Sequence, residues 1–120
     1  MYLVDRSVAS IRPKQAFLDW LQSQPDWDVA LTLEQLRVDC HIFLLPEFNE
    51  PEEAIAYIDE CYMQIFQMEL ASWYDDSAVW PADQSLKAFW EWFDIEVHST
   101  VFDTVDEALR NAPVEGGLLN

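Results

Sequence analysis

The segment SLKAFWEWFDIEVHSTVFD, residues 85–103, changes from a helical to a strand pattern and sets the fold class. Ser85 is a good helix-capping residue, and the apolar side chains after it keep helical spacing: Leu86, Phe89, Trp90 and Phe93. From residue 95 onward apolar and polar side chains alternate, as they do in a strand with one buried face. The segment therefore predicts a core-facing helix that is followed at once by a strand over 95–105.

The first half of the chain carries signals for two more strands and a helix between them. Residues 2–11 are rich in β-branched and aromatic types and predict a strand. Pro13 fits the first turn of a helix, which we place over 13–23. The run HIFLLP, residues 41–46, is continuously apolar. This favours a strand that is buried on both faces and central in the sheet.

Two further helices complete the pattern. Thr32 and Gln35 have the spacing of a capping box and predict a short helix. Pro51 suits a first helical position, and helical spacing of apolar side chains continues from there to about residue 72. The predicted order is β-α-α-β-α-α-β. It describes an α+β single domain over residues 1–111, with a small sheet of about three strands and helices packed on it. Residues 112–120 are expected to form a loose C-terminal tail.

The composition combines many apolar side chains with a large negative charge. Hydrophobic residues make up 51% of the 120 residues, and six Trp, seven Phe and four Tyr favour a packed core over disorder. Twenty-three acids against six Lys and Arg give a net charge of −17. Such a charge disfavours nucleic acids and anionic membranes as direct partners and favours a basic protein surface. Alternatively, the acids serve solubility alone.

Signals for secretion and for metal binding are missing from the sequence. The start, MYLVDRSVAS, lacks the apolar run of a signal peptide, so we expect a cytoplasmic protein with reduced thiols at Cys40 and Cys61. These cysteines, with His41 and His98, do not have the spacing of a zinc motif. Because glycine-rich phosphate loops and nucleophile motifs are also missing, we expect neither a metal nor a cofactor.

Aromatic and acidic side chains outside the helical stripes are the main candidates for partner binding. Trp92 lies off the stripe of its helix, and residues 73–84 form an irregular segment rich in Trp and Asp. An exposed aromatic ring beside carboxylates suits a cationic side chain. Alternatively, the rings of residues 73–84 pin that loop to the core. The candidate partner-binding residues are Asp59, Glu60, Trp73, Tyr74, Asp75, Asp76, Trp80 and Trp92.

Glu96 and His98 are the candidates for catalysis. They share one face of the predicted strand, which brings a carboxylate and an imidazole close enough to act as an acid–base pair. Alternatively, they belong to a solvated strand face. A small enzyme that uses this pair, together with Arg12 or Lys14, is one alternative function. A structural accessory subunit is another.

Three segments resemble a family of small acidic bacterial proteins without assigned activity: IRPKQAFLDWL (11–21), HIFLLPEF (41–48) and SLKAFWEWFDIEVHS (85–99). The resemblance implies a bacterial, cytoplasmic, single-domain protein, and it carries no catalytic or binding residues to this sequence. The main functional hypothesis therefore rests on the residues alone. It is a non-enzymatic interaction protein of the inhibitor, immunity or nucleic-acid-mimic type, which binds a basic protein.

Overall fold

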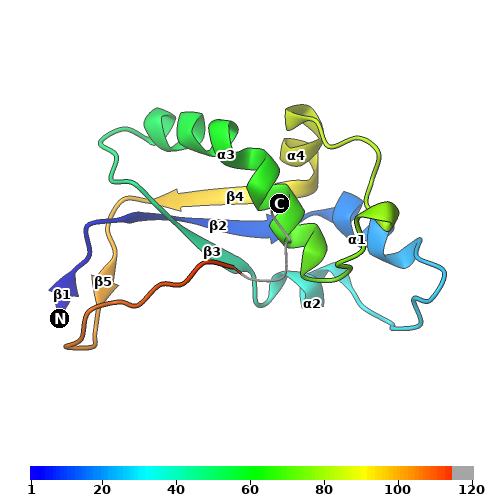
Figure 1. Ribbon diagram of the computed structural model, residues 1–120, viewed down its shortest axis with the longest axis horizontal. Coiled ribbons are helices and arrows are strands. Elements are labelled where there is room, and N and C mark those ends of the chain that lie inside the picture. The colour runs from blue at the N-terminus through cyan, green and yellow to red at the C-terminus, as the bar shows by residue number, and fades with distance from the viewer. Residues whose placement is uncertain (115–120) are drawn as a thin grey trace.

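The computed structural model describes residues 1–114 and has the α+β architecture that the sequence predicts (Figure 1). Its main sheet contains three antiparallel strands in the order β3-β2-β4, where β2 is Ser7–Pro13, β3 is His41–Leu45 and β4 is Phe93–His98. The helices are α1 (Gln15–Gln22), α2 (Leu33–Arg37), α3 (Pro51–Ala71) and α4 (Leu86–Trp92), with the 3-10 turn η1 (Ser77–Val79) before α4. Residues 115–120, which hold most of the predicted tail, lie outside the described residues.

The core lies between the sheet and the helices. Figure 1 shows α3 and α4 over the same face of the sheet. Phe66 of α3 contacts Phe89 of α4 and Phe93 of β4, with ring centroids 5.9 and 5.6 Å apart. Aromatic pairs of this kind add about 0.5–1.5 kcal/mol beyond the burial of their surface. The other large and fully buried side chains are Ile11, Phe17, Leu21, Ile58 and Leu70.

β2 is the central strand, and this corrects the prediction that residues 41–46 are central. Ile11 of β2 lies opposite His41 of β3 and opposite Ile95 of β4. β3 is an edge strand, and its Ile42 and Leu44 are 58% and 51% exposed. A continuous apolar run is typical of a strand covered on both faces. Here the helices cover one face only, so the apolar side chains of β3 that point the other way contact solvent.

Pro13 ends β2 and does not open a helix, so that part of the prediction is wrong. It lies opposite Phe93 in the register of β2 and β4. The Lys14 N–H then extends the pairing by donating to the Trp92 carbonyl oxygen at 2.8 Å. Proline is tolerated here because the pairing of β2 with β3 has already ended at Ile11, so its missing N–H removes no ladder hydrogen bond.

Three predicted helix starts are confirmed. The Thr32 hydroxyl accepts a hydrogen bond from the Gln35 backbone N–H at 3.1 Å, and the Gln35 side-chain oxygen accepts from the Thr32 N–H at 2.9 Å. The Ser85 hydroxyl accepts from the backbone N–H of Ala88. Pro51 is the first residue of α3. Local capping chemistry thus fixes where these helices begin.

A small second sheet forms at one end of the molecule. It pairs β1 (Tyr2–Leu3) with β5 (Phe102–Asp103) in antiparallel orientation. The Val4 N–H donates to the Val101 carbonyl oxygen at 2.9 Å and continues this pairing. The strands predicted over 2–11 and 95–105 are therefore each divided in two, and the outer part of each leaves the main sheet.

Candidate functional site

Most basic side chains form ion pairs with acids of the same chain. Of the six Lys and Arg residues, four form ion pairs within residues 1–114. Acids outnumber bases by 23 to six, so these pairs leave a large excess of uncompensated carboxylates on the surface. The pairs are Arg6–Asp5 (3.2 Å), Arg12–Glu96 (3.7 Å), Arg37–Asp94 (3.1 Å) and Lys87–Glu91 (3.0 Å).

The solvent side of α3 combines acids with exposed apolar side chains, and we call it the acidic helix face. It consists of Glu52, Glu53, Tyr57, Glu60 and Met63, all of which are exposed. Tyr57, Glu60 and Met63 line a shallow hollow of about 310 Å³. Acids beside an aromatic ring and a methionine give this face both charge and an apolar contact area.

The two acids predicted on α3 have different environments. Glu60 belongs to the acidic helix face and is exposed. Asp59 is half-buried, and its carboxylate accepts a hydrogen bond from the Trp90 indole N–H at 2.8 Å. A charge-assisted hydrogen bond of this kind stabilises the contact between α3 and α4. Glu60 is therefore accessible to a partner, whereas Asp59 is engaged within the fold.

Hydrogen bonds hold two predicted binding residues of the loop after α3. The Trp80 indole N–H donates to the Tyr74 carbonyl oxygen at 2.7 Å. The Tyr74 hydroxyl in turn donates to Asp26 at 3.0 Å, and its ring packs edge-on against Trp20. Tyr74 and Trp80 are both half-buried against the core. These two aromatic rings pin the loop, as the alternative interpretation of the sequence expected.

Of the candidate binding residues in this loop, Trp73, Asp75 and Asp76 are exposed. Trp73 is 44% exposed, and one side of its ring contacts Trp27 at a centroid distance of 5.9 Å. The Asp76 carboxylate caps η1 by accepting from the Ala78 backbone N–H at 2.9 Å. Among these candidates, Trp73 and Asp75 are thus the ones that a partner can reach without removing a cap.

Trp92 points into the core, which corrects the prediction that it faces away from the helical stripe. Its ring lies 6.0 Å from Phe17 and 5.5 Å from Phe66, measured between centroids. The expected stripe included Phe93, but Phe93 is the first residue of β4 and not part of the helix. Without it, Phe89 and Trp92 mark the inward face of α4, because residues three apart share one side of a helix.

Glu96 and His98 meet on the exposed side of β4, as their spacing predicts. His98 Nε2 lies 2.7 Å from Glu96 Oε1, and Arg12 Nη1 lies 3.7 Å from Glu96 Oε2. The His98 and Glu96 side chains are each more than half exposed. The distance suits an acid–base pair, but the two groups lack the burial that tunes catalytic side chains.

A second histidine–carboxylate pair lies in a cleft that the sequence analysis missed. His41 begins β3, and its Nδ1 lies 2.9 Å from Oε1 of Glu69 on α3. The Glu69 side chain is only 7% exposed, whereas about half of His41 is accessible. Asp39, Cys40 and Trp73 lie beside them, and together these residues line much of a cleft of about 200 Å³. We call it the His41–Glu69 cleft.

The signal that could have revealed this cleft is the position of Glu69 itself. Glu69 follows Ile65 by four residues and Phe66 by three, so it lies on the buried stripe of α3. Burying a carboxylate is unfavourable unless a partner compensates it. A charged residue on an apolar stripe therefore predicts a polar partner, although the stripe does not say that this partner is His41.

The surroundings of Glu69 change its proton affinity. Burial raises the pKa of Glu69 above its ordinary value of 4.5, and the charge and hydrogen bond of His41 oppose part of this rise. The folded protein therefore binds the Glu69 proton more tightly than the unfolded chain does. Deprotonation of Glu69 consequently favours unfolding.

We expect the Glu69→Gln variant to gain stability relative to the wild type as the pH rises from about 4.5 through the raised pKa of Glu69. Only the wild type must ionise a buried carboxylate over this interval, so the two unfolding free energies should change differently. Urea denaturation across this pH range measures the difference. The control is Glu60→Gln, an exposed acid on the same helix, which should follow the wild type. A constant difference between wild type and Glu69→Gln would contradict the prediction.

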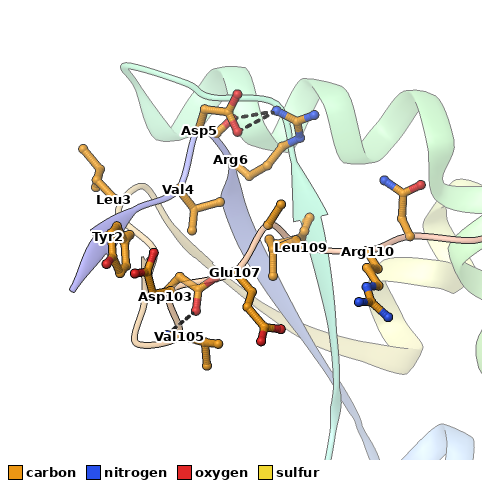
Figure 2. Close-up of a pocket in the computed structure, with 14 residues that line it drawn as sticks. Tyr2, Leu3, Val4, Asp5, Arg6, Asp103, Val105, Glu107, Leu109 and Arg110 are labelled. Carbon is orange, nitrogen blue, oxygen red and sulfur yellow. Dashed lines mark hydrogen bonds and ion pairs between the residues drawn. The ribbon is translucent and has the colours of Figure 1, made fainter.

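A further hollow lies between the N-terminal segment and residues 103–111 (Figure 2). Its volume is about 750 Å³. Charged side chains around it interact with their own neighbours: Arg6 pairs with Asp5, and the Asp103 carboxylate accepts from the Val105 N–H. In Figure 2 the labelled charged side chains point in different directions. The hollow therefore has room for a ligand, but its polar groups do not converge on one point.

The described residues, 1–114, contain neither a metal-binding cluster nor a membrane-spanning helix. In this part of the chain, no group of three or more His, Cys, Asp and Glu side chains is placed to hold a metal ion. Cys40 and Cys61 are free thiols. None of the described helices combines the length and the apolar character that crossing a membrane requires.

Comparisons with known proteins find no relative of this chain. No protein-family model matches the chain. Neither the curated proteins nor the solved structures contain a significant match. The function must therefore be inferred from the residues and their geometry.

Proposed function

We propose that this protein is a non-enzymatic interaction protein of the bacterial cytoplasm that binds a basic protein partner. The observation that carries the proposal is the uncompensated acidity of the surface. The chain has 23 acids and six Lys and Arg residues, and four of these bases form ion pairs with acids of the same chain. An inhibitor, an immunity protein or a nucleic-acid mimic acts on partners whose own surfaces are basic.

The binding surface comprises the acidic helix face and the exposed loop residues Trp73 and Asp75. α3 has 21 residues, and at 1.5 Å per residue it extends for about 30 Å. The acids of its first turns and the loop after its last turn therefore lie at opposite ends of an elongated acidic surface. A surface of this length is compatible with a standard interface of about 800 Å² on each partner.

Aromatic and apolar side chains supply the contacts that charge alone does not. Tyr57, Met63 and Trp73 are exposed beside carboxylates. Tyrosine, tryptophan and methionine are enriched at protein interfaces, and an indole ring also attracts cations. The carboxylates attract the basic partner over a distance, and these three side chains then contact it.

We expect the triple variant Glu52→Lys, Glu60→Lys, Asp75→Lys to bind the basic partner at least about tenfold more weakly than the wild type. These acids are exposed, so their reversal should leave the fold intact. Asp59 and Asp76 are not included because they bond to Trp90 and cap η1. The partner is first captured from source-cell extract at low salt, identified by mass spectrometry and purified. Its affinity for each variant is then measured by titration calorimetry.

A matched control has the same change in charge at another place. Glu47, Asp106 and Glu107 are also exposed, and reversing these three should weaken binding much less. Affinity for the wild type should fall as salt rises from about 50 to about 500 mM, because the screening length shortens from about 14 to about 4 Å. A partner that binds equally at both salt concentrations, or that tolerates the triple reversal, would show that the acids serve solubility.

A small enzyme is the second candidate function. The contact of 2.7 Å between His98 and Glu96 favours it, and Arg12 is close enough to hold an anionic group near the pair. It ranks below the interaction protein because both side chains are exposed and no burial tunes them for proton transfer.

A further inference from the structure

The His41–Glu69 cleft presents a buried carboxylate that has no lysine or arginine partner within residues 1–114. In this part of the chain, Glu69 forms an ion pair with His41 only. The Arg37 guanidinium, on the neighbouring helix α2, donates instead to the Pro13 carbonyl oxygen at 3.0 Å and to Asp94 at 3.1 Å. Within residues 1–114, the Glu69 carboxylate is therefore left without a lysine or arginine partner.

The shape of the cleft limits what it can hold. Its volume is about 200 Å³, which is below the range of about 300–1,000 Å³ that is usual for small-molecule and cofactor sites. Its polar lining residues are Asp39, His41, Glu69 and Ser72. The apolar residues Ile11, Pro13, Phe17 and Leu36 also border it, but all four are buried. The cleft therefore suits a single polar head group rather than a whole small molecule.

We propose that the His41–Glu69 cleft is the anchor site for a single arginine side chain of the basic partner. Glu69 accepts the guanidinium group, and the exposed Trp73 ring stacks on its plane. The inference deepens the proposed function and rests on it, since the partner supplies the arginine. The loop that carries Asp75 continues directly from Trp73, so the cleft adjoins the proposed binding surface.

Arginine suits this site better than lysine for two geometric reasons. A guanidinium group is a planar fork that pairs with a carboxylate through two hydrogen bonds and stacks on an aromatic ring. Its hydration is weaker than that of an ammonium group, so less free energy is lost when it enters a site that shields Glu69 from water. His41 occupies one oxygen of Glu69 through its Nδ1 atom and holds the carboxylate in position.

The test uses N-acetyl-arginine amide as a probe of the full-length protein, followed by NMR. Saturable shifts should appear at the Trp73 indole N–H and the His41 ring. N-acetyl-citrulline amide has nearly the same shape without the charge and should produce no saturable shift. N-acetyl-lysine amide should bind more weakly than the arginine probe. Equal binding of the arginine and citrulline probes, or arginine shifts that never saturate and spread over all acids, would overturn the proposal.

Two variants and a control locate the site. Glu69→Gln keeps the size of the side chain and its ability to bond His41, yet should weaken the arginine probe about tenfold or more because a charge-assisted hydrogen bond is lost. Trp73→Ala should weaken the probe about threefold through loss of stacking. Glu47→Gln, an exposed acid outside both the cleft and the proposed binding surface, should bind as the wild type does. Unchanged binding to Glu69→Gln would refute the anchor.

The two proposals fail in different ways. If the triple reversal weakens partner binding but the arginine probe binds Glu69→Gln as well as it binds the wild type, the proposed interaction function is supported and the arginine anchor is refuted. The opposite result is also possible to distinguish. If the arginine probe binds the cleft saturably, while the partner binds the triple variant and binds at high salt as well as before, the anchor is supported and the acidic surface is not the basis of binding.

Discussion

Replacing Phe89 by alanine should lower the free energy of unfolding by about 3–5 kcal/mol. Phe89 is fully buried, and its ring contacts Tyr62, Phe66 and Phe93 at centroid distances of 5.7, 5.9 and 5.3 Å. Alanine would leave a cavity where α3, α4 and the sheet meet. Urea denaturation followed by circular dichroism measures the loss, which is a large part of the 5–15 kcal/mol that is typical of a domain.

The matched control for Phe89→Ala is Tyr57→Ala, which removes an aromatic ring from the acidic helix face. Tyr57 is exposed, so its removal should change the free energy of unfolding by less than about 1 kcal/mol. Similar losses for the two variants would mean that Phe89 does not belong to the core.

Replacing Trp92 by alanine should destabilise the protein by about 3 kcal/mol or more. The Trp92 ring contacts Phe17 of α1 and Phe66 of α3. Its removal therefore deletes packing contacts between α4 and two other helices. Trp73→Ala is the control, since it removes the same side chain from a position that is 44% exposed. The Trp73 variant should lose less than about 1 kcal/mol. If Trp92→Ala is as harmless as Trp73→Ala, then Trp92 faces solvent and the inward face of α4 must be reassigned.

Features that depend on a few neighbouring residues could be predicted from the sequence. The helix starts at Thr32 and Ser85 are fixed by capping groups within three residues, and α3 begins at Pro51, whose φ already suits a first helical position. The contact between Glu96 and His98 follows from the period of two in a strand, whatever the strand pairs with. The α+β class follows from the same local patterns.

Features that depend on distant residues could not be predicted in this way. The apolar run of β3 does not indicate which strands pair with it. The run alone predicts a central strand, whereas β2 is the central strand of the sheet. The orientation of Trp92 depends on where α4 ends and β4 begins. The spacing of the apolar residues does not fix this boundary, because Phe93 fits both the helical stripe and the strand. His41 and Glu69, which pair, are 28 residues apart in the chain.

The central place of β2 affects the order in which the chain folds during its synthesis. β2 is made before β3 and β4, and its Val8 pairs with His98, near the other end of the domain. At about 5–20 residues per second, β2 waits for several seconds before β4 exists. Pairing of such distant segments is also slow because a long loop must close. We therefore expect β2 and β3 to pair first, and Ala9 and Ile11 to remain incompletely covered until β4 leaves the ribosome.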